Sequence, residues 1–234
     1  NDGGTVWSPG WKPCKTPLDF YECRHGMSYT RITGAKDGIQ ASVLFFVPLH
    51  TWAEVQKVTL TNTGDAPKKI KLYSFAEWCL WNAATDMENF QRNFSTGEVE
   101  VDGSVIYHKT EYKERRNHYA FYSVNAPVDG FDTDRETFIG LYNEFRDPQN
   151  VMSGVSTGSI AHGWSPVASH YIEVELQPGE SKDYVFLLGY VENEQEEKFM
   201  LDAEGKLVFD VPGLLHSGSS PVINKAKAQE LIAA

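Results

Sequence analysis

Three consecutive segments decide the fold: Ser28-Tyr-Thr-Arg-Ile-Thr33, Lys36-Asp-Gly38 and Ile39-Gln-Ala-Ser-Val-Leu-Phe-Phe-Val47. The outer two are rich in β-branched and aromatic residues, which suit a pleated and half-buried surface. Between them, Asp-Gly supplies the positive φ that a tight hairpin turn demands. The three segments therefore predict an antiparallel β-hairpin.

The same pattern continues along the chain. Further strands are expected at residues 53–63, 68–75, 97–101, 104–108, 118–125, 136–141, 170–176 and 182–191. Gln177-Pro-Gly-Glu180 has proline and glycine where a type II turn needs them. About ten strands at hairpin spacing, with no long helical pattern between them, predict an all-β protein built as a large antiparallel β-sandwich.

The organisation of the chain follows from these patterns. Residues 1–200 are expected to form a partial β-sandwich domain, residues 201–221 a loop or insertion, and residues 222–234 a linker helix capped by Asn224. The acidic residues 192–198 suit a short helix. The chain begins at Asn1 without a leader, and we expect it to be a piece of a longer polypeptide.

Composition excludes several classes of function. The 234 residues carry 32 acidic and 21 basic side chains, which gives a net charge of −11. Nucleic acids and anionic membranes need a basic surface, so neither is an expected partner. The longest apolar runs are strand-sized, which predicts no membrane-spanning helix.

Cysteine and histidine spacing gives no metal motif. The cysteines, Cys14, Cys23 and Cys79, are odd in number and lack C-x-x-C spacing, which predicts free thiols in a reducing compartment, the cytoplasm. The seven histidines form neither an H-x-H nor an H-E-x-x-H pattern, so no metal site is expected.

Two pairs of carboxylates could serve a glycosidase, which needs two carboxyl groups about 5–10 Å apart. Glu98 and Glu100 alternate on one strand, and Asp132 and Asp134 stand in Gly130-Phe-Asp-Thr-Asp-Arg135. A solvated strand face explains the first pair better, and a turn with local backbone hydrogen bonds explains the second. The sequence contains no P-loop motif.

The segment from Trp78 to Glu98 has the chemistry of a sugar-binding surface. Two indoles, Trp78 and Trp81, lead into a polar loop at residues 82–93. Amides and guanidinium groups pair with sugar hydroxyls, and aromatic faces pack on pyranose rings. Each indole by itself is better explained as a core residue.

Long stretches of the chain resemble glycoside hydrolase family 94, the cellobiose phosphorylase family, in its N-terminal domain. The resemblance runs from about Trp7 to Val191 and is carried by several motifs: Trp7-Ser-Pro-Gly-Trp11, Asp19-Phe-Tyr-Glu-Cys-Arg-His-Gly26, Phe45-Phe-Val-Pro-Leu49, Asn89-Phe-Gln-Arg-Asn-Phe-Ser-Thr-Gly-Glu98 and His118-Tyr-Ala-Phe-Tyr-Ser-Val-Asn125. The family match begins inside the domain, so the first strands are expected to be missing, and the isolated fragment is expected to be poorly soluble.

The resemblance implies a function for the whole polypeptide. The β-sandwich would be followed by an (α/α)6 barrel that carries the catalytic aspartate. The enzyme would need no cofactor. Inorganic phosphate would be the co-substrate that converts cellobiose to α-glucose 1-phosphate and glucose, with inversion. The family forms homodimers in which the β-domain reaches the partner's active site. By this resemblance, Asn89, Gln91 and Arg92 would contribute to the glucose pocket.

Two alternatives remain open. The chain could be an autonomous carbohydrate-binding β-sandwich module, or a hydrolase that uses Glu98 and Glu100.

Overall fold

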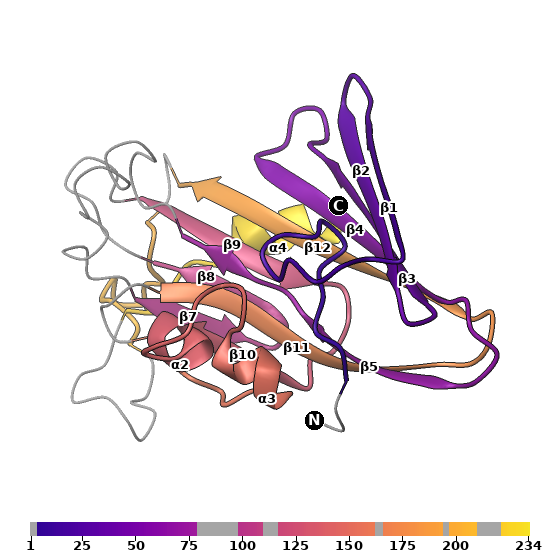
Figure 1. Cartoon of the computed structure of the whole chain (residues 1–234). Helices are drawn as coiled ribbons and strands as arrows, with labels where there is room; N and C mark the ends of the chain where they lie inside the picture. The colour runs from indigo at the N-terminus through magenta and orange to yellow at the C-terminus, as the bar shows by residue number, and fades with distance from the viewer. Residues whose placement is uncertain (1–3, 79–97, 110–116, 162–165, 194–196, 210–220) are drawn as a thin grey trace, which may run out of the picture.

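Two antiparallel sheets face each other in the computed structural model (Figure 1), which describes residues 4–78, 98–109, 117–161, 166–193, 197–209 and 221–234. In these residues the large sheet has eight strands, ordered β1 (Phe20–His25), β2 (Tyr29–Lys36), β3 (Ile39–Phe46), β4 (Ala53–Asn62), β12 (Ser181–Glu192), β9 (His118–Val124), β8 (Val105–His108) and β7 (Val99–Asp102). The small sheet contains β10 (Gly130–Asp134), β11 (Pro166–Leu176) and β5 (Lys68–Tyr73), with β6 (Ala76–Glu77) also paired to β11. The all-β antiparallel sandwich expected from the sequence is confirmed.

The expected first hairpin is present with its register. Ile39 pairs with Lys36 and Val43 with Ile32 across β2 and β3, and the turn places Gly38 at φ 76°. The pairing continues through β4 to β12, where Tyr184 lies opposite Val58. One continuous sheet therefore joins β1, at residues 20–25, to residues 181–192.

The main core fills the space between the two sheets. Its members include Val43, Leu60 and Phe186 from the large sheet and Ile172 and Leu176 from the small one. Each such fully buried side chain contributes about 1.5–3 kcal/mol relative to leaving it exposed. The sandwich is held chiefly by this layer.

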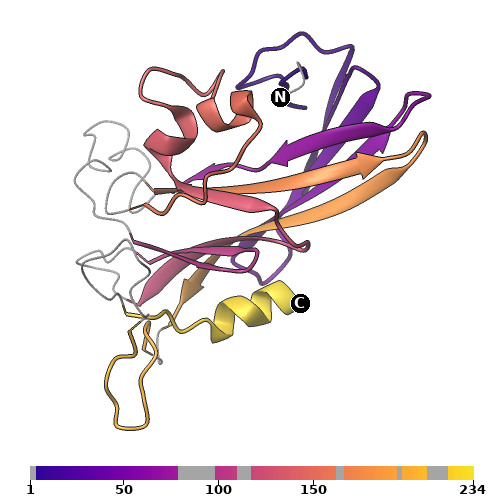
Figure 2. The same cartoon turned by 90° about the horizontal axis from the view of Figure 1, so that it is seen from below.

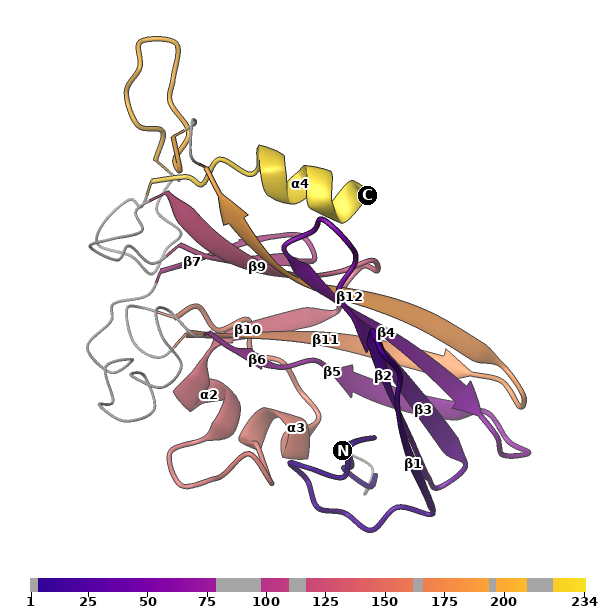
Figure 3. The same cartoon turned by 90° about the horizontal axis from the view of Figure 1, so that it is seen from above.

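A second core lies on the opposite face of the large sheet, under helix α4 (Ala226–Ala233). Ile223 and Ala228 pack there against Tyr107, Tyr119 and Phe121. Figures 2 and 3 show α4 on one side of the sheets, and α2 (Arg135–Ile139) and α3 (Gln149–Ser153) on the other. The expected C-terminal helix is present, although it begins after Lys225 rather than Asn224.

The prediction of a strand at residues 136–141 is wrong, because residues 136–139 belong to helix α2. Asp134 caps the helix: its side chain accepts a hydrogen bond from the Thr137 amide at 2.7 Å. Gly140, at φ 95°, ends the helix. A side-chain cap and a terminal glycine override the β-propensity of Thr137, Phe138 and Ile139.

Of residues 192–198, which were expected to form a short helix, the structure describes Glu192, Asn193, Glu197 and Lys198 and none of these is helical, while residues 194–196 lie outside the described residues. Strand β12 ends at Glu192. After Lys198, Phe199 forms an isolated antiparallel bridge with Ile223. Further along, Leu201 pairs with Leu207 across a turn at residues 202–206. Residues 197–209 therefore form extended chain and turns.

Candidate functional site

The loop expected to bind sugar contains Asn89, Gln91 and Arg92, and all three lie outside the described residues. The structure does describe both flanks of the loop. The chain leaves the small sheet after β6 and enters the large sheet at β7. Residues 78–98 therefore join the two sheets.

Trp78 anchors the first flank. Its indole packs against the main core and stacks on the His108 ring, with ring centroids 5.3 Å apart and planes 13° apart. This contact confirms that Trp78 is a core residue, while Trp81 lies outside the described residues. Burial lowers the pKa of His108 to about 3, and the positive charge of Lys198 adds to the effect, so the ring is neutral.

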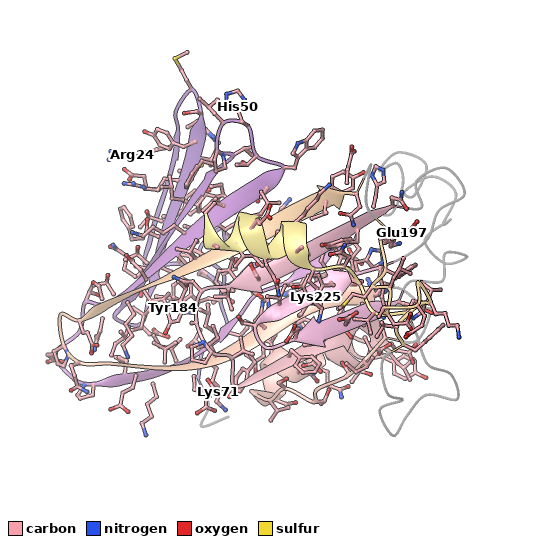
Figure 4. The ribbon with its side chains drawn as sticks, turned by 180° about the vertical axis from the view of Figure 1, so that it is seen from behind. Arg24, His50, Lys71, Tyr184, Glu197 and Lys225 are labelled. Atoms are coloured by element: carbon pink, nitrogen blue, oxygen red, sulfur yellow. The ribbon has the colours of Figure 1, made fainter. Side chains whose placement is uncertain are left out.

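Glu100, on the second flank, has a structural role. Its carboxylate lies 2.6 Å from Lys225 Nζ and 3.6 Å from Lys109 Nζ, and it accepts a hydrogen bond from the Ile223 amide at 3.1 Å. Figure 4 shows Lys225 beside the start of α4, over the strands of the large sheet. Burial opposes the charge of Lys225, but hydrogen bonds to Glu100 and Asp102 outweigh it and raise the lysine pKa. Glu100 thus ties the C-terminal segment to β7.

Asp132 and Asp134 do not form a catalytic pair. Asp132 lies buried in strand β10, where the sequence predicted a turn. Its carboxylate accepts hydrogen bonds from Asn150, Thr157 and Ser159, with distances of 2.5–3.3 Å. Asp134 caps α2, as the predicted local backbone hydrogen bond requires. Both carboxylates therefore organise the loops over the small sheet.

A cluster that sequence reasoning missed lies where β4, β9 and β12 meet. Trp52 packs against Tyr190, with ring centroids 6.2 Å apart, and the hydroxyl of Tyr190 contacts His118 Nδ1. His118 Nδ1 also lies 3.5 Å from a Glu192 carboxylate oxygen. These residues share no motif, since strand pairing alone brings them together from distant segments.

The described residues contain neither a metal-binding cluster nor a membrane-spanning helix. No group of three or more His, Cys, Asp or Glu side chains among them could hold a metal ion. No helix in the same residues is long and apolar enough to cross a membrane. Cys14 and Cys23 are free thiols, as expected, and Cys79 lies outside the described residues.

The architecture defines a class: an antiparallel supersandwich in which an eight-stranded sheet faces a small one, in the part of the chain described. The chain belongs to the family described as "Glycosyl hydrolase 94, supersandwich domain", whose family model matches residues 1–204.

Curated relatives support the same family. Solabiose phosphorylase of Paenibacillus borealis is 31% identical over 91% of this chain, and the match covers 28% of that protein. N,N'-diacetylchitobiose phosphorylase of Vibrio furnissii is 29% identical over 81% of this chain and 24% of its own length. A 3-O-beta-D-glucopyranosyl-beta-D-glucuronide phosphorylase of Paenibacillus borealis is 29% identical over 88% of this chain and 27% of its own length. The chain spans about a quarter of the length of these relatives.

Proposed function

We propose that this chain is part of the N-terminal domain of an inverting disaccharide phosphorylase. The observation that carries the proposal is the family match over residues 1–204, together with relatives that are named phosphorylases. The chain would serve as scaffold, dimer contact and contributor to the partner subunit's sugar site. An (α/α)6 barrel elsewhere in the polypeptide would carry the catalytic aspartate, in the cytoplasm.

The proposed reaction needs no cofactor. A phosphate oxygen attacks the anomeric carbon of the non-reducing sugar, the bond to the bridging oxygen breaks, and that oxygen takes a proton from the aspartic acid. For cellobiose the products are α-glucose 1-phosphate and glucose. Because phosphate is the nucleophile, one carboxylic acid suffices, which agrees with the structural roles of Glu100 and Asp132.

We propose cellobiose as the substrate on the basis of the sequence resemblance. The names of the relatives give two alternative substrates to compare with it, solabiose and N,N'-diacetylchitobiose. The test incubates the full polypeptide with phosphate and, separately, cellobiose, diacetylchitobiose and solabiose, and measures the sugar 1-phosphate formed. We expect phosphate-dependent α-glucose 1-phosphate from cellobiose at the highest kcat/KM. Faster turnover of another disaccharide contradicts cellobiose but keeps the class, whereas no phosphorolysis of any disaccharide favours the autonomous binding module.

The proposed role of the loop is tested at Arg92. A guanidinium that donates to a sugar hydroxyl strengthens binding in a way that alanine cannot replace. For Arg92→Ala in the full polypeptide we expect a loss of about ten- to a hundredfold in kcat/KM. Arg24→Ala is the matched control, since the Arg24 side chain is 68% exposed and pairs with Glu22 on the same strand. Unchanged phosphorolysis in Arg92→Ala rules out the loop's role.

A further inference from the structure

Strand pairing in the large sheet places a row of polar and aromatic side chains on the same face as the main core. Leu188 lies opposite Glu54, and Phe186 lies opposite Gln56. Facing residues in an antiparallel pair point to the same side, so Glu54 and Gln56 share the side of Leu188 and Phe186. The next pair along is Trp52 and Tyr190, joined by a hydrogen bond from the Tyr190 amide to the Trp52 carbonyl. His50, two residues before Trp52, marks this end of the sheet at the tip of the loop after β3 in Figure 4.

Trp52 presents an open aromatic surface in this row. Trp52 is 66% exposed although its ring packs against Tyr190, at an interplanar angle of 43°. The tyrosine ring contacts the indole and leaves most of the residue open to solvent. Tryptophan combines a large apolar ring with a polar N–H and is enriched at binding interfaces.

Polar groups share this face of the sheet with the ring. Along β4, Gln56 donates to Glu54 at 2.7 Å and accepts from the Tyr122 hydroxyl at 3.3 Å. On the neighbouring strands, Glu192 of β12 lies 3.5 Å from His118 of β9, which also contacts Tyr190. The His118 and Glu192 side chains are 22% and 29% exposed, so both groups reach solvent from a braced position. Carboxylate, amide and imidazole groups together offer both donors and acceptors.

We propose that this face, defined by Trp52, Glu54, Gln56, His118, Tyr190 and Glu192, binds a neutral saccharide chain. The C–H face of a pyranose packs on the open side of the indole, and the surrounding carboxylates and amide pair with its hydroxyls. Two carboxylates on the face and a net charge of −11 repel acidic saccharides, which selects neutral ones. The proposal does not depend on the phosphorylase activity.

The test is affinity electrophoresis of the full polypeptide in native gels that contain a soluble neutral β-glucan. We expect the glucan to retard the wild-type protein, and an acidic polysaccharide of similar size to leave its mobility unchanged. Trp52→Ala should weaken the glucan affinity by about tenfold or more, because truncating a central tryptophan removes the main contact. Trp52→Phe should retain part of the affinity, because phenylalanine can still stack on the sugar. This result would show that the loss in Trp52→Ala comes from the missing ring and not from misfolding.

Trp11→Ala is the matched control, since Trp11 is 44% exposed and lies in the N-terminal segment. It should bind the glucan as the wild type does. Retardation that survives in Trp52→Ala, or that is lost equally in Trp11→Ala, overturns the proposal, as does a wild-type protein that the glucan does not retard. A change of oligomeric state in Trp52→Ala with unchanged glucan binding assigns the face to a protein interface instead. Glucan binding without phosphorolysis would sink the proposed function and leave this inference standing.

Discussion

At the residue scale, Glu100 shows how a carboxylate with the right spacing for catalysis can serve structure instead. Its neighbour Lys109 is 1% exposed at the side chain, and Glu100 itself is 11% exposed. Two lysines, Lys109 and Lys225, converge on this one carboxylate. Charges taken out of water are stable only when each keeps its partner, so removing the carboxylate is more costly than the pair's net contribution suggests.

For Glu100→Gln we therefore expect a loss of about 3 kcal/mol in the free energy of unfolding, because the sheltered ammonium groups of Lys109 and Lys225 both lose this carboxylate, although Lys225 keeps its contact with Asp102. Denaturant unfolding followed by tryptophan fluorescence measures this change. Glu22→Gln removes a carboxylate from an exposed pair with Arg24 and should leave the midpoint nearly unchanged. Equal denaturation midpoints for Glu100→Gln and the wild type would show that Glu100, Lys109 and Lys225 are solvated in the folded protein.

At the element scale, the sequence predicted the hairpins well because their signals are local. Asp37 and Gly38 turn β2 into β3, and alternating residues mark the inner face of β4. Helix α2 was missed because the capping side chain of Asp134 decides it, against the β-propensity of the residues that follow. Asp132 was assigned to a turn because its partners, Thr157 and Ser159, come from a loop that only the tertiary structure brings to it.

Helix α4 packs on the large sheet through Ala228 and the partly buried Leu231. Ala228 is fully buried against the second core, and Lys227 Nζ donates to the Glu192 carbonyl at 2.9 Å beside it. For Ala228→Leu we expect a loss of about 1–3 kcal/mol, because the added carbons have no space between the helix and the sheet. Thermal or denaturant unfolding checks this value. Ala226→Leu places the same side chain at an exposed position of the same helix and should unfold as the wild type does; similar losses in both variants would show that the helix does not pack closely.

At the scale of the whole molecule, the sandwich depends on pairings that no local pattern contains. Strand β12 lies between β4 and β9, so residues 181–192 close a sheet begun in the first half of the chain. The same pairing assembles the Trp52 face from three strands, which explains why the sequence did not reveal it. The loop with Asn89, Gln91 and Arg92 was found by resemblance, and its role stays a prediction.

Two histidines buried by the sandwich make its stability depend on pH. Burial lowers the pKa of His108 to about 3 and that of His170 to about 4, the latter although a hydrogen bond to the Ser104 carbonyl opposes the shift. The unfolded chain protonates both rings near pH 6.5, where the folded protein keeps them neutral. Their contribution to stability is therefore fully present above about pH 6.5 and is lost as the pH falls toward 4 and 3.

The free energy of unfolding should accordingly fall by about 2 kcal/mol between pH 6 and pH 5, since each histidine contributes up to 1.36 kcal/mol per pH unit. Denaturant unfolding at a series of pH values measures the slope. His108→Phe should reduce the slope by about half, because an aromatic ring that cannot titrate keeps the stacking against Trp78. A His108→Phe protein with the wild-type slope would mean that His108 is protonated in the folded sandwich, and that the core between the sheets admits water at this ring.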